Sequence, residues 1–372
     1  MATKVVNLET ASYSEAIREA ADVLTRGGLV VFPTETVYGV GACATLPEAV
    51  ERLRVLKSRT DGKPFTVHIG QKSAIHRFVP EMAGTARRLV EKTWPGPLTI
   101  IFEVADAQAT PVIQETSPEH VPAMYHNGTI GVRCPDDHVA SDLLTQTSLP
   151  VVAASANLAG NPAPVTAEEA LADLDGRVDL VLDAGRSRYA KASTIVQVDA
   201  KGYRVLREGI LDERTIRRLN RTNFLLVCSG NTCRSPMAAG LLRRLLAEKL
   251  QCREDELAEK GYYVESAGTG ACSGAPATPE AIEVLRAKGI EIAGHRSQPL
   301  TLEQINRADY IFAMTGRQAE NIKSLAAHAE HRVQKVGDED IEDPIGGTEE
   351  EYRACANQIE SALRRRLEEV VL

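Results

Sequence analysis

The sequence predicts an α/β protein made of two units in series. Short apolar runs that end in turn-forming residues alternate with segments of helical periodicity along most of the 372 residues. That length exceeds what one hydrophobic core usually organises and suits two domains. Hydrophobic residues make up 43% and charged residues 25% of the chain, which is the ordinary balance of a globular protein.

Composition and charge exclude several classes of partner. The net charge of -8 provides no overall basic field for nucleic acid or an anionic membrane. No apolar run approaches the ~20 residues that span a bilayer, and the first residues lack the apolar core of a signal peptide. The seven cysteines are scattered and odd in number, unlike a disulfide framework. We therefore expect a cytoplasmic protein with reduced thiols, no membrane partner and no strong direct nucleic-acid binding.

The first unit is expected to span residues 1–210. Five apolar runs predict strands, several of them buried, at 28–34, 65–70, 129–134, 150–155 and 179–185. Segments 46–59 and 166–174 have helical periodicity, with Thr166 as the expected N-cap of the second. Two alternating segments, STIVQVD and YRVLREG, close the unit. Residues 211–222 are charged and lack a core pattern, which predicts a linker.

The second unit, residues 223–372, alternates more regularly. Strands are expected at 223–228, 262–267, 310–315 and 333–337, and helices at 236–251, 279–288 and 349–369. Such alternation predicts a parallel sheet with right-handed crossovers and a ligand site at the carboxyl ends of the strands. Thr348 and Glu351 have the spacing of a capping box that opens the last helix.

The loop after the first of these strands, CSGNTCRSP, has the features of an anion site. A glycine-bearing loop between a strand and a helix turns successive N–H groups inward. Arg234 and the helix dipole would favour a thiolate at Cys228, because both stabilise negative charge. Ser235 is expected to cap the helix and Pro236 to open it. A thiolate facing a phosphoryl group is placed for in-line attack, and Arg234 would clamp the equatorial oxygens.

The six-residue spacing between Cys228 and Arg234 also arises by chance, and a buried structural cysteine followed by a surface arginine would explain it. The preceding strand, the internal glycine and the following Ser-Pro favour the catalytic interpretation. The chemistry also needs a group that protonates the leaving group and then activates water. Asp343, between the last strand and the last helix, is the candidate, because a parallel-sheet site would lie on that edge.

Five segments of this unit, VCSGNTCRSPMA, SAGTGA, HRSQPLT, RADYIFAMT and EDPIGG, resemble the low-molecular-weight protein-tyrosine-phosphatase family over nearly all of residues 223–370. The resemblance implies a doubly wound, four-stranded parallel sheet. It also implies that Cys228 is the nucleophile, Arg234 the phosphate clamp and Asp343 the general acid and base, without a cofactor or metal. The other residues of the phosphate-binding loop would be Ser229, Gly230, Asn231, Thr232, Cys233 and Ser235, with Asn231 and Ser235 holding the loop.

The resemblance also bears on the substrate. Thr232 stands where tyrosine-directed members usually carry an aliphatic residue, and the GNTCRS loop resembles the protein-arginine-phosphatase branch, in which this threonine favours phosphoarginine. Ile345 replaces the family's usual aromatic residue after Asp-Pro, which removes a ring that would stack on a phenol. We expect a phosphoprotein substrate phosphorylated on arginine, with phosphotyrosine as the alternative.

Cys233 has two interpretations. Its thiol could trap oxidised Cys228 as a reversible disulfide, or it could simply fill the underside of the loop. An arsenate-reductase variant is disfavoured, because the later cysteine pair expected of it is absent and that region has only Cys272.

The first unit has neither GxGxxG nor a Walker A lysine. Cations and small polar donors instead stand at helix and strand ends, namely Lys57, Arg59, Lys63, His68, Arg133, Ser155, Asn157, Ser193 and Arg207. Each alone is most simply a solvated or structural residue. Together they suit a polyanion held in a concave site.

Seven segments, PTETVYGVG, LKSRTDGKPFTVHI, TWPGPLTI, GVRCPD, ASANLAG, LVLDAG and STIVQV, resemble the YrdC-like threonylcarbamoyl-AMP synthases over about residues 10–210. The resemblance implies a twisted, open α/β sheet. It implies that L-threonine, bicarbonate and ATP give threonylcarbamoyl-adenylate and pyrophosphate, the first step toward N6-threonylcarbamoyladenosine at position 37 of tRNAs. The tRNA threonylcarbamoyl-transfer machinery is then an expected partner.

The same resemblance assigns residues to each ligand. ATP or its phosphates would contact Lys57, Arg59, Lys63, Thr129, Ser155, Asn157 and Arg207. The threonine would be surrounded by Thr34, Thr36, His68, Arg133 and Ser193. Mg²⁺ would accompany ATP through its phosphates, with no metal site made by the protein.

The leading hypothesis is therefore a bifunctional enzyme that joins a synthase to a phosphatase. A rival hypothesis is a binding module, in which the first unit holds structured RNA and the second is a silent scaffold. The acidic net charge and the intact set of Cys228, Arg234 and Asp343 favour the enzyme.

Overall fold

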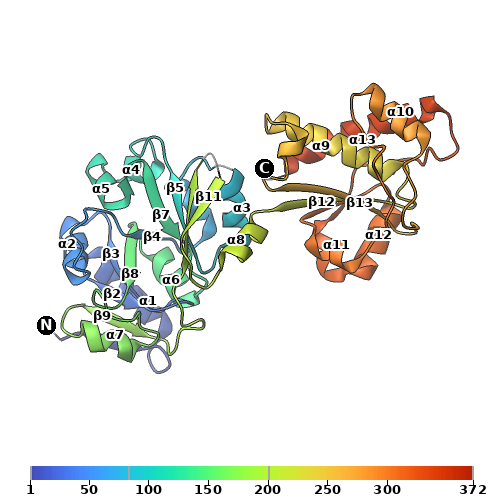
Figure 1. The fold of residues 1–372 in the computed structure, drawn as a ribbon. Helices are drawn as coiled ribbons and strands as arrows, with labels where there is room; N and C mark the ends of the chain where they lie inside the picture. Colours follow the sequence, from blue (N-terminus) through green and yellow to red (C-terminus); the bar gives the residue numbers. More distant parts are fainter. Residues whose placement is uncertain (1, 83, 200–201, 371–372) are drawn as a thin grey trace. The chain divides into compact units, whose positions relative to one another are not determined.

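The computed structural model describes residues 2–82, 84–199 and 202–370. The chain divides into two compact units, Met1–Leu219 and Asn220–Leu372 (Figure 1). Each unit is an α/β fold with its own sheet, as the sequence predicts. Among the described residues, no helix is both long enough and apolar enough to cross a bilayer.

In the described part of unit 1, eleven strands form one mixed sheet. The sheet runs in the order β1 (Lys4–Asn7), β9 (Leu180–Asp183), β2 (Val30–Phe32), β3 (Gly39–Cys43), β8 (Val151–Ser155), β4 (Thr66–His68), β7 (Thr129–Arg133), β5 (Leu98–Glu103), β10 (Thr194–Asp199) and β11 (Gly202–Arg207), with β6 (Tyr125–His126) paired to β7. All five expected strands are present, and the two alternating segments form the antiparallel pair β10–β11. The order starts at β1 and ends at β11, so the sheet is open.

Helices pack on both faces of this sheet. They are α1 (Tyr13–Thr25), α2 (Pro47–Leu56), α3 (Gly84–Thr93), α4 (Pro111–Glu115), α5 (Val121–Met124), α6 (His138–Gln146), α7 (Ala167–Leu174) and α8 (Glu213–Leu219), with 3₁₀ turns η1 (Lys72–Arg77) and η2 (Pro118–His120). Val30 and Phe32 of β2 pack with α1 and α6, whereas Val31 packs with the cluster that contains α2, α3 and α7. Burial on both faces explains the uninterrupted apolar run of β2. The expected Thr166 cap is confirmed, because its side chain accepts from the Glu169 N–H.

Helix α8 lies inside the segment expected to be a linker. Ile216 of this helix is fully buried in the hydrophobic core of unit 1. Residues 213–219 therefore belong to the packing of unit 1. The pattern does not predict this helix, because two apolar residues, Ile216 and Leu219, in a short charged segment produce no period.

Within the described residues of unit 2, four parallel strands form the sheet. Their order is β13 (Tyr262–Gly268), β12 (Thr222–Cys228), β14 (Tyr310–Ala313) and β15 (Val333–Lys335). One face carries α9 (Arg234–Lys249), α10 (Pro279–Ala287) and α13 (Glu349–Glu369), and the other carries α11 (Leu302–Arg307) and α12 (Gly316–Leu325) (Figure 1). Two 3₁₀ turns, η3 (Glu254–Glu256) and η4 (Ala327–Arg332), complete the unit. The predicted doubly wound parallel sheet is confirmed.

Among the described residues of unit 2, capping boxes begin three α-helices and the 3₁₀ turn η3. The expected box of α13 is confirmed, with Thr348 accepting from the Glu351 N–H while the Glu351 side chain accepts from the Thr348 N–H. The sequence analysis did not identify the boxes of α11, opened by Thr301, and α12, opened by Thr315. The box of α12 lies beside the candidate site described next.

Candidate active sites

The loop from Cys228 to Ser235 leaves β12 at the carboxyl end of the sheet in unit 2. β12 lies between β13 and β14, and all three strands point the same way. The segment after β13 holds the start of the loop, since the Thr269 N–H donates to the Cys228 carbonyl at 2.9 Å and the Gly270 N–H donates to the Ser229 carbonyl at 3.0 Å. The loop thus lies on the edge where the sequence predicts a ligand site.

Asn231 organises the interior of this loop. It adopts a left-handed conformation, with φ of 54°. Its side-chain amide donates to Ser235 Oγ at 2.8 Å and to Ser266 Oγ at 2.9 Å, while its Oδ1 accepts from the Gln298 N–H at 2.9 Å. His295 Nε2 donates to the Asn231 carbonyl at 2.7 Å. Since Asn231 is fully buried, these bonds satisfy its polar groups and fix the curvature of the loop.

Cys228 stands at the floor of the loop, 2% exposed. Its Sγ accepts from the Asn231 N–H at 3.1 Å and lies 3.0 Å from Ser235 Oγ. Both neighbours can donate a hydrogen bond to sulfur, and donors of this kind stabilise the anionic form of a thiol.

The expected role of Ser235 as a helix cap is wrong. Helix α9 begins at Arg234, and Cys233 occupies its N-cap position without a side-chain cap. Ser235 lies within the first turn, where its hydroxyl faces Cys228 and Asn231. The loop enters the helix two residues earlier than the Ser-Pro pattern indicates, because Asn231 turns the chain. The expectation that Ser235 and Asn231 hold the loop agrees with these contacts.

Arg234 is 4% exposed, and its two terminal nitrogens contact the loop that carries Asp343. One terminal nitrogen donates to the Ile341 carbonyl at 2.9 Å, and the other forms an ion pair with Asp343 Oδ2. Among the described residues, Arg234 Nε is buried and has no hydrogen-bond partner. A buried guanidinium nitrogen without an acceptor costs free energy, so an anion bound in the loop would relieve that cost.

Cys233 and Thr232 lie on the side of the loop that faces α13. Cys233 Sγ is buried, 3.3 Å from the Tyr352 hydroxyl and 3.6 Å from Thr232 Oγ1. The Thr278 hydroxyl also reaches this sulfur, at 3.7 Å. These contacts agree with the packing interpretation of Cys233. Ile345, two residues after Asp343, is 64% exposed.

Sequence reasoning missed several residues that support this loop. A Cβ added to Gly268 would lie 2.5 Å from the Ser229 carbonyl oxygen and 3.0 Å from the Asn231 nitrogen, so only glycine permits the loop to pass so close to β13. Ser266, His295, Gln298 and Gln318 also contact the loop. Four of these five lie in the quoted segments SAGTGA and HRSQPLT, but no local spacing connects them to Cys228.

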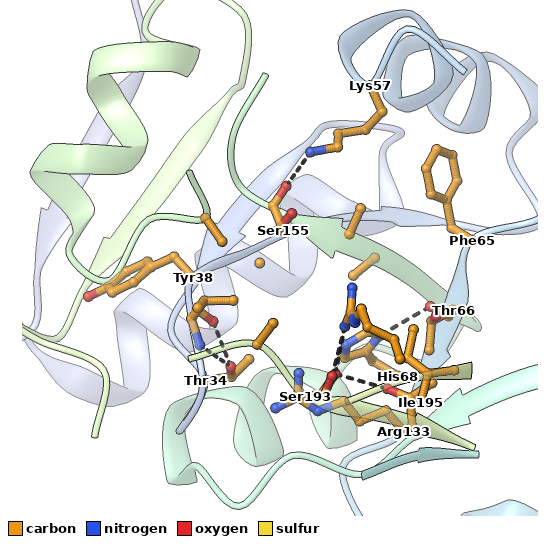
Figure 2. A pocket seen from close by; sticks show the side chains of 18 of the residues that line it. Thr34, Tyr38, Lys57, Phe65, Thr66, His68, Arg133, Ser155, Ser193 and Ile195 are labelled. Atoms are coloured by element: carbon orange, nitrogen blue, oxygen red, sulfur yellow. Dashed lines mark hydrogen bonds between the residues drawn. The ribbon is translucent and has the colours of Figure 1, made fainter. Parts of the chain in front are cut away.

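Unit 1 contains a cavity of about 320 Å³ at strand ends of its sheet (Figure 2). The lining includes eight of the residues expected to bind ATP or threonine: Thr34, Lys57, Arg59, His68, Arg133, Ser155, Ser193 and Arg207. They come from six strands or their flanking loops and from the end of α2. The structure therefore brings together residues that are up to 173 positions apart in the sequence.

Lys57 extends from the end of α2 to the end of β8. Its ammonium group donates to the Ser155 carbonyl at 2.9 Å (Figure 2). It also donates to the Asn157 carbonyl at 2.6 Å and to Asn157 Oδ1 at 3.1 Å. Burial lowers the pKa of Lys57 to about 8, nearby Asp173 opposes this, and Arg59 adds to the lowering. The surroundings of Lys57 therefore bring the pKa of its ammonium group close to neutral pH.

Arg59 and Arg207 supply further cationic groups to the lining of the cavity. The Arg59 guanidinium lies 4.7 Å from the centre of the Phe65 ring and donates to the Pro64 carbonyl at 3.0 Å. Arg207 donates to the Ser193 carbonyl at 2.8 Å, and burial together with Arg133 lowers its pKa. Several cations close together repel one another, so an anion between them would be favoured.

Arg133 forms a buried ion pair that the sequence analysis did not anticipate. Its guanidinium lies 3.0 Å from Glu35 Oε2, with side chains 6% and 1% exposed. It also donates to Thr36 Oγ1 at 2.6 Å, and Thr36 shares a 2.8 Å hydrogen bond with Thr34. Glu35 lies within the quoted PTETVYGVG segment, but its burial against a strand 98 residues later has no local signal.

His68 is uncharged in this cavity. Burial lowers its pKa to about 3, and the nearby charge of Arg133 contributes. Since Nδ1 lies 3.1 Å from the Thr66 carbonyl, Nδ1 carries the proton and Nε2 retains a lone pair (Figure 2). The cavity thus combines cationic donors with a neutral imidazole that can accept a hydrogen bond.

Four residues expected in this site do not line the cavity. Thr36 and Asn157 lie behind the lining residues. Thr36 accepts a hydrogen bond from Arg133, and Asn157 accepts one from Lys57. Lys63 is exposed on the turn before β4. Thr129 is at the opposite end of β7 from Arg133, roughly 13 Å away along the strand, and its hydroxyl donates to the His126 carbonyl. The geometry therefore does not bring Thr129 to this cavity.

Fold and geometry together describe a two-part α/β protein with two candidate sites whose residues suit an anion, one of them built on a cysteine. The profile of the Sua5–YciO–YrdC family, described as telomere recombination, matches residues 22–209. The profile described as low molecular weight phosphotyrosine protein phosphatase matches residues 223–371. The chain belongs to the first family through unit 1 and to the second through unit 2, which confirms both resemblances.

Individual relatives agree with this assignment. The threonylcarbamoyl-AMP synthase of Pyrococcus abyssi is 31% identical over 58% of this chain and 61% of its own length. The probable low molecular weight protein-tyrosine-phosphatase EpsP of Ralstonia solanacearum is 43% identical over 32% of this chain and 77% of its own length. The chain spans 61% of the Pyrococcus protein and 51% of the Bacillus subtilis threonylcarbamoyl-AMP synthase.

One solved structure covers nearly the whole chain. Sua5 of Pyrococcus abyssi, complexed with L-threonine, aligns with a TM-score of 0.51 over 97% of this chain and 98% of its own, at 21% identity. At that identity the likeness concerns the fold.

Proposed function

We propose that the chain is a bifunctional enzyme. Residues 1–210 would form L-threonylcarbamoyladenylate and pyrophosphate from L-threonine, bicarbonate and ATP. Residues 223–372 would hydrolyse phosphoproteins, with phosphoarginine as the substrate residue. The adenylate would then pass to the machinery that modifies adenosine 37 of tRNAs.

The observation that supports the synthase is the charge pattern of the cavity in unit 1. Lys57, Arg59 and Arg207 neutralise the phosphates of ATP, and Mg²⁺ accompanies the nucleotide through the same phosphates. Arg133 offers a guanidinium to the threonine carboxylate. His68 Nε2 accepts from the threonine amino group because that ring is neutral. No residue acts as a covalent nucleophile, so catalysis arises from positioning and electrostatics.

The synthase is tested by pyrophosphate release from ATP with the full chain. Release should require both L-threonine and bicarbonate and should fall at least about 100-fold in Arg59→Ala, because one phosphate-facing cation is lost. Detection of threonylcarbamoyl-adenylate by mass spectrometry identifies the product. Salt-dependent RNA binding without pyrophosphate release would instead support the binding-module alternative.

The observation that supports the phosphatase is Cys228 Sγ within a ring of donors beside the unpartnered Nε of Arg234. The thiolate attacks phosphorus, the S–P bond forms, and the bond to the leaving nitrogen breaks as Asp343 supplies a proton. Asp343 then takes a proton from water, whose oxygen attacks phosphorus and releases the thiolate. The ion pair of Arg234 with Asp343 must open first, so that the guanidinium can turn to the phosphoryl oxygens.

The choice of phosphoarginine rests on the walls of the site. Thr232 supplies a hydroxyl in the loop, and Ile345 supplies no aromatic ring to stack on a phenol. Hydrolysis rates for matched phosphoarginine and phosphotyrosine peptides test this choice. Thr232→Ile should move the ratio of kcat/KM toward phosphotyrosine by about tenfold. A wild-type preference for phosphotyrosine would refute it.

A further inference from the structure

Ser229, the residue after the nucleophile, presents its side chain at the mouth of the loop. It is exposed, although Cys228 before it and Asn231 after it are buried. Its backbone is held by the bond from the Gly270 N–H to its carbonyl at 3.0 Å. The hydroxyl therefore stands on a held backbone, accessible to solvent and one residue after Cys228.

Gln318 holds this hydroxyl from the neighbouring helix. Its Nε2 donates to Ser229 Oγ at 3.0 Å, across 89 residues of sequence. Its Oε1 accepts from the Thr315 N–H at 3.1 Å in the capping box of α12. Since a backbone N–H can only donate, the amide oxygen must face Thr315 and the amide nitrogen must face Ser229. Gln318 is buried, so this orientation is fixed.

The direction of that bond decides what Ser229 can offer. A hydroxyl has one hydrogen and two lone pairs. One lone pair is used by Gln318, which leaves one hydrogen and one lone pair for a ligand. A phosphoarginine side chain presents the complementary groups side by side, a phosphoryl oxygen that accepts and a guanidinium N–H that donates. In phosphotyrosine the phosphoryl group is followed by ring carbons, which leave the lone pair without a donor.

We propose that Ser229 is a specificity-determining residue for the guanidinium of phosphoarginine, and that Gln318 is the residue that positions it. This inference rests on the proposed phosphatase function and adds a second determinant to Thr232. A site built to bond a substrate N–H rejects an analogue that lacks it more strongly than an apolar wall does.

The test measures kcat/KM of the full chain for matched phosphoarginine and phosphotyrosine peptides and for p-nitrophenyl phosphate. Ser229→Ala should lower the ratio of phosphoarginine to phosphotyrosine rates about tenfold, because a hydrogen bond to a charged group is lost. Ser229→Thr keeps the hydroxyl and should restore most of the ratio. Gln318→Met should lower the ratio about threefold, mainly through KM, since the hydroxyl remains but is no longer oriented.

The matched control is Thr315→Ala. It removes the hydroxyl that accepts from the Gln318 N–H but leaves both side-chain bonds of Gln318 in place. It should weaken α12 without changing the ratio. Equal losses on both peptides in Ser229→Ala, or a shifted ratio in Thr315→Ala, would overturn the inference while leaving the phosphatase intact. If the wild type hydrolyses none of the three substrates, the proposed function itself fails and this inference with it.

Discussion

The two sites of this chain are assembled in opposite ways. In unit 2, the proposed nucleophile, phosphate-binding backbone and cationic clamp lie within the eight residues from Cys228 to Ser235. In unit 1, the cations and acceptors come from six strands or their flanking loops and from one helix end. A contiguous loop depends on a few supporting contacts, whereas a dispersed cavity depends on the whole sheet. Substitutions should therefore affect chemistry first in unit 2 and both stability and binding in unit 1.

The largest effect is expected at Cys228. Cys228→Ser should lower phosphatase kcat at least about 10³-fold, because the hydroxyl is a far weaker nucleophile than a thiolate. Threonine-dependent pyrophosphate release by the same preparation should stay at its wild-type rate and serves as the control. Turnover retained by the serine variant would contradict the assigned nucleophile.

The dispersed site of unit 1 is best tested by removing its buried ion pair between Arg133 and Glu35. Arg133→Met should destabilise unit 1 by about 3–5 kcal/mol, since it leaves the Glu35 carboxylate buried without a counter-charge. Trp94, the single tryptophan of the chain, is buried in the core of unit 1, so its fluorescence during urea unfolding of the full chain measures this unit. Adding Glu35→Leu should recover most of the loss. A double variant as unstable as the single one would show that the pairing is unimportant.

The support of the contiguous loop is tested at Gly268. Gly268→Ala places a methyl group 2.5 Å from the Ser229 carbonyl, so the loop must shift. We expect phosphatase kcat/KM to fall about 10- to 100-fold, because small displacements of the cradle weaken in-line attack. Gly270→Ala is the matched control, since no heavy atom lies within 4 Å of its added Cβ. Equal losses in the two variants would contradict the close approach of β13.

The smallest expected effect is a dependence of ATP affinity on pH in unit 1. Lys57 has a pKa of about 8 in the fold against an ordinary value of 10.5, so it loses its charge as the pH rises from 7 to 9. ATP affinity should fall by up to about tenfold across that interval, because a cation facing the phosphates disappears. Calorimetric titration at constant ionic strength measures the change, and Lys57→Arg should abolish it.

Stability should respond to pH in the opposite direction. Between pH 8 and 10.5 the unfolded chain keeps the Lys57 proton that the fold has released, so the unfolded state binds more protons and this group's contribution to stability rises with pH. Urea unfolding followed at Trp94 over this window checks the sign. A parallel loss of ATP affinity and stability would contradict the role of burial.

Much of the fold followed from pattern alone. The strands at 223–228, 262–267 and 310–315 and the long last helix lie within a few residues of their expected positions, because period and turn chemistry are local properties. The sequence pattern did not predict helix α8, because its one buried residue, Ile216, cannot produce a repeating apolar pattern. The N-terminus of α9 was misplaced because the chain already turns at Asn231, so that Cys233 and not Ser235 occupies the N-cap position.

The sequence by itself determined the two α/β units, the loop from Cys228 to Arg234 and the kinds of residue that surround the cavity of unit 1. Only the tertiary structure decided that Glu35 neutralises Arg133, that Thr129 lies away from the cavity, and that Gln318 orients Ser229. The physical reason is distance along the chain. Hydrogen bonds and periodicity within a few residues leave a local pattern, whereas burial and charge pairing between distant strands exist only once the sheet has formed.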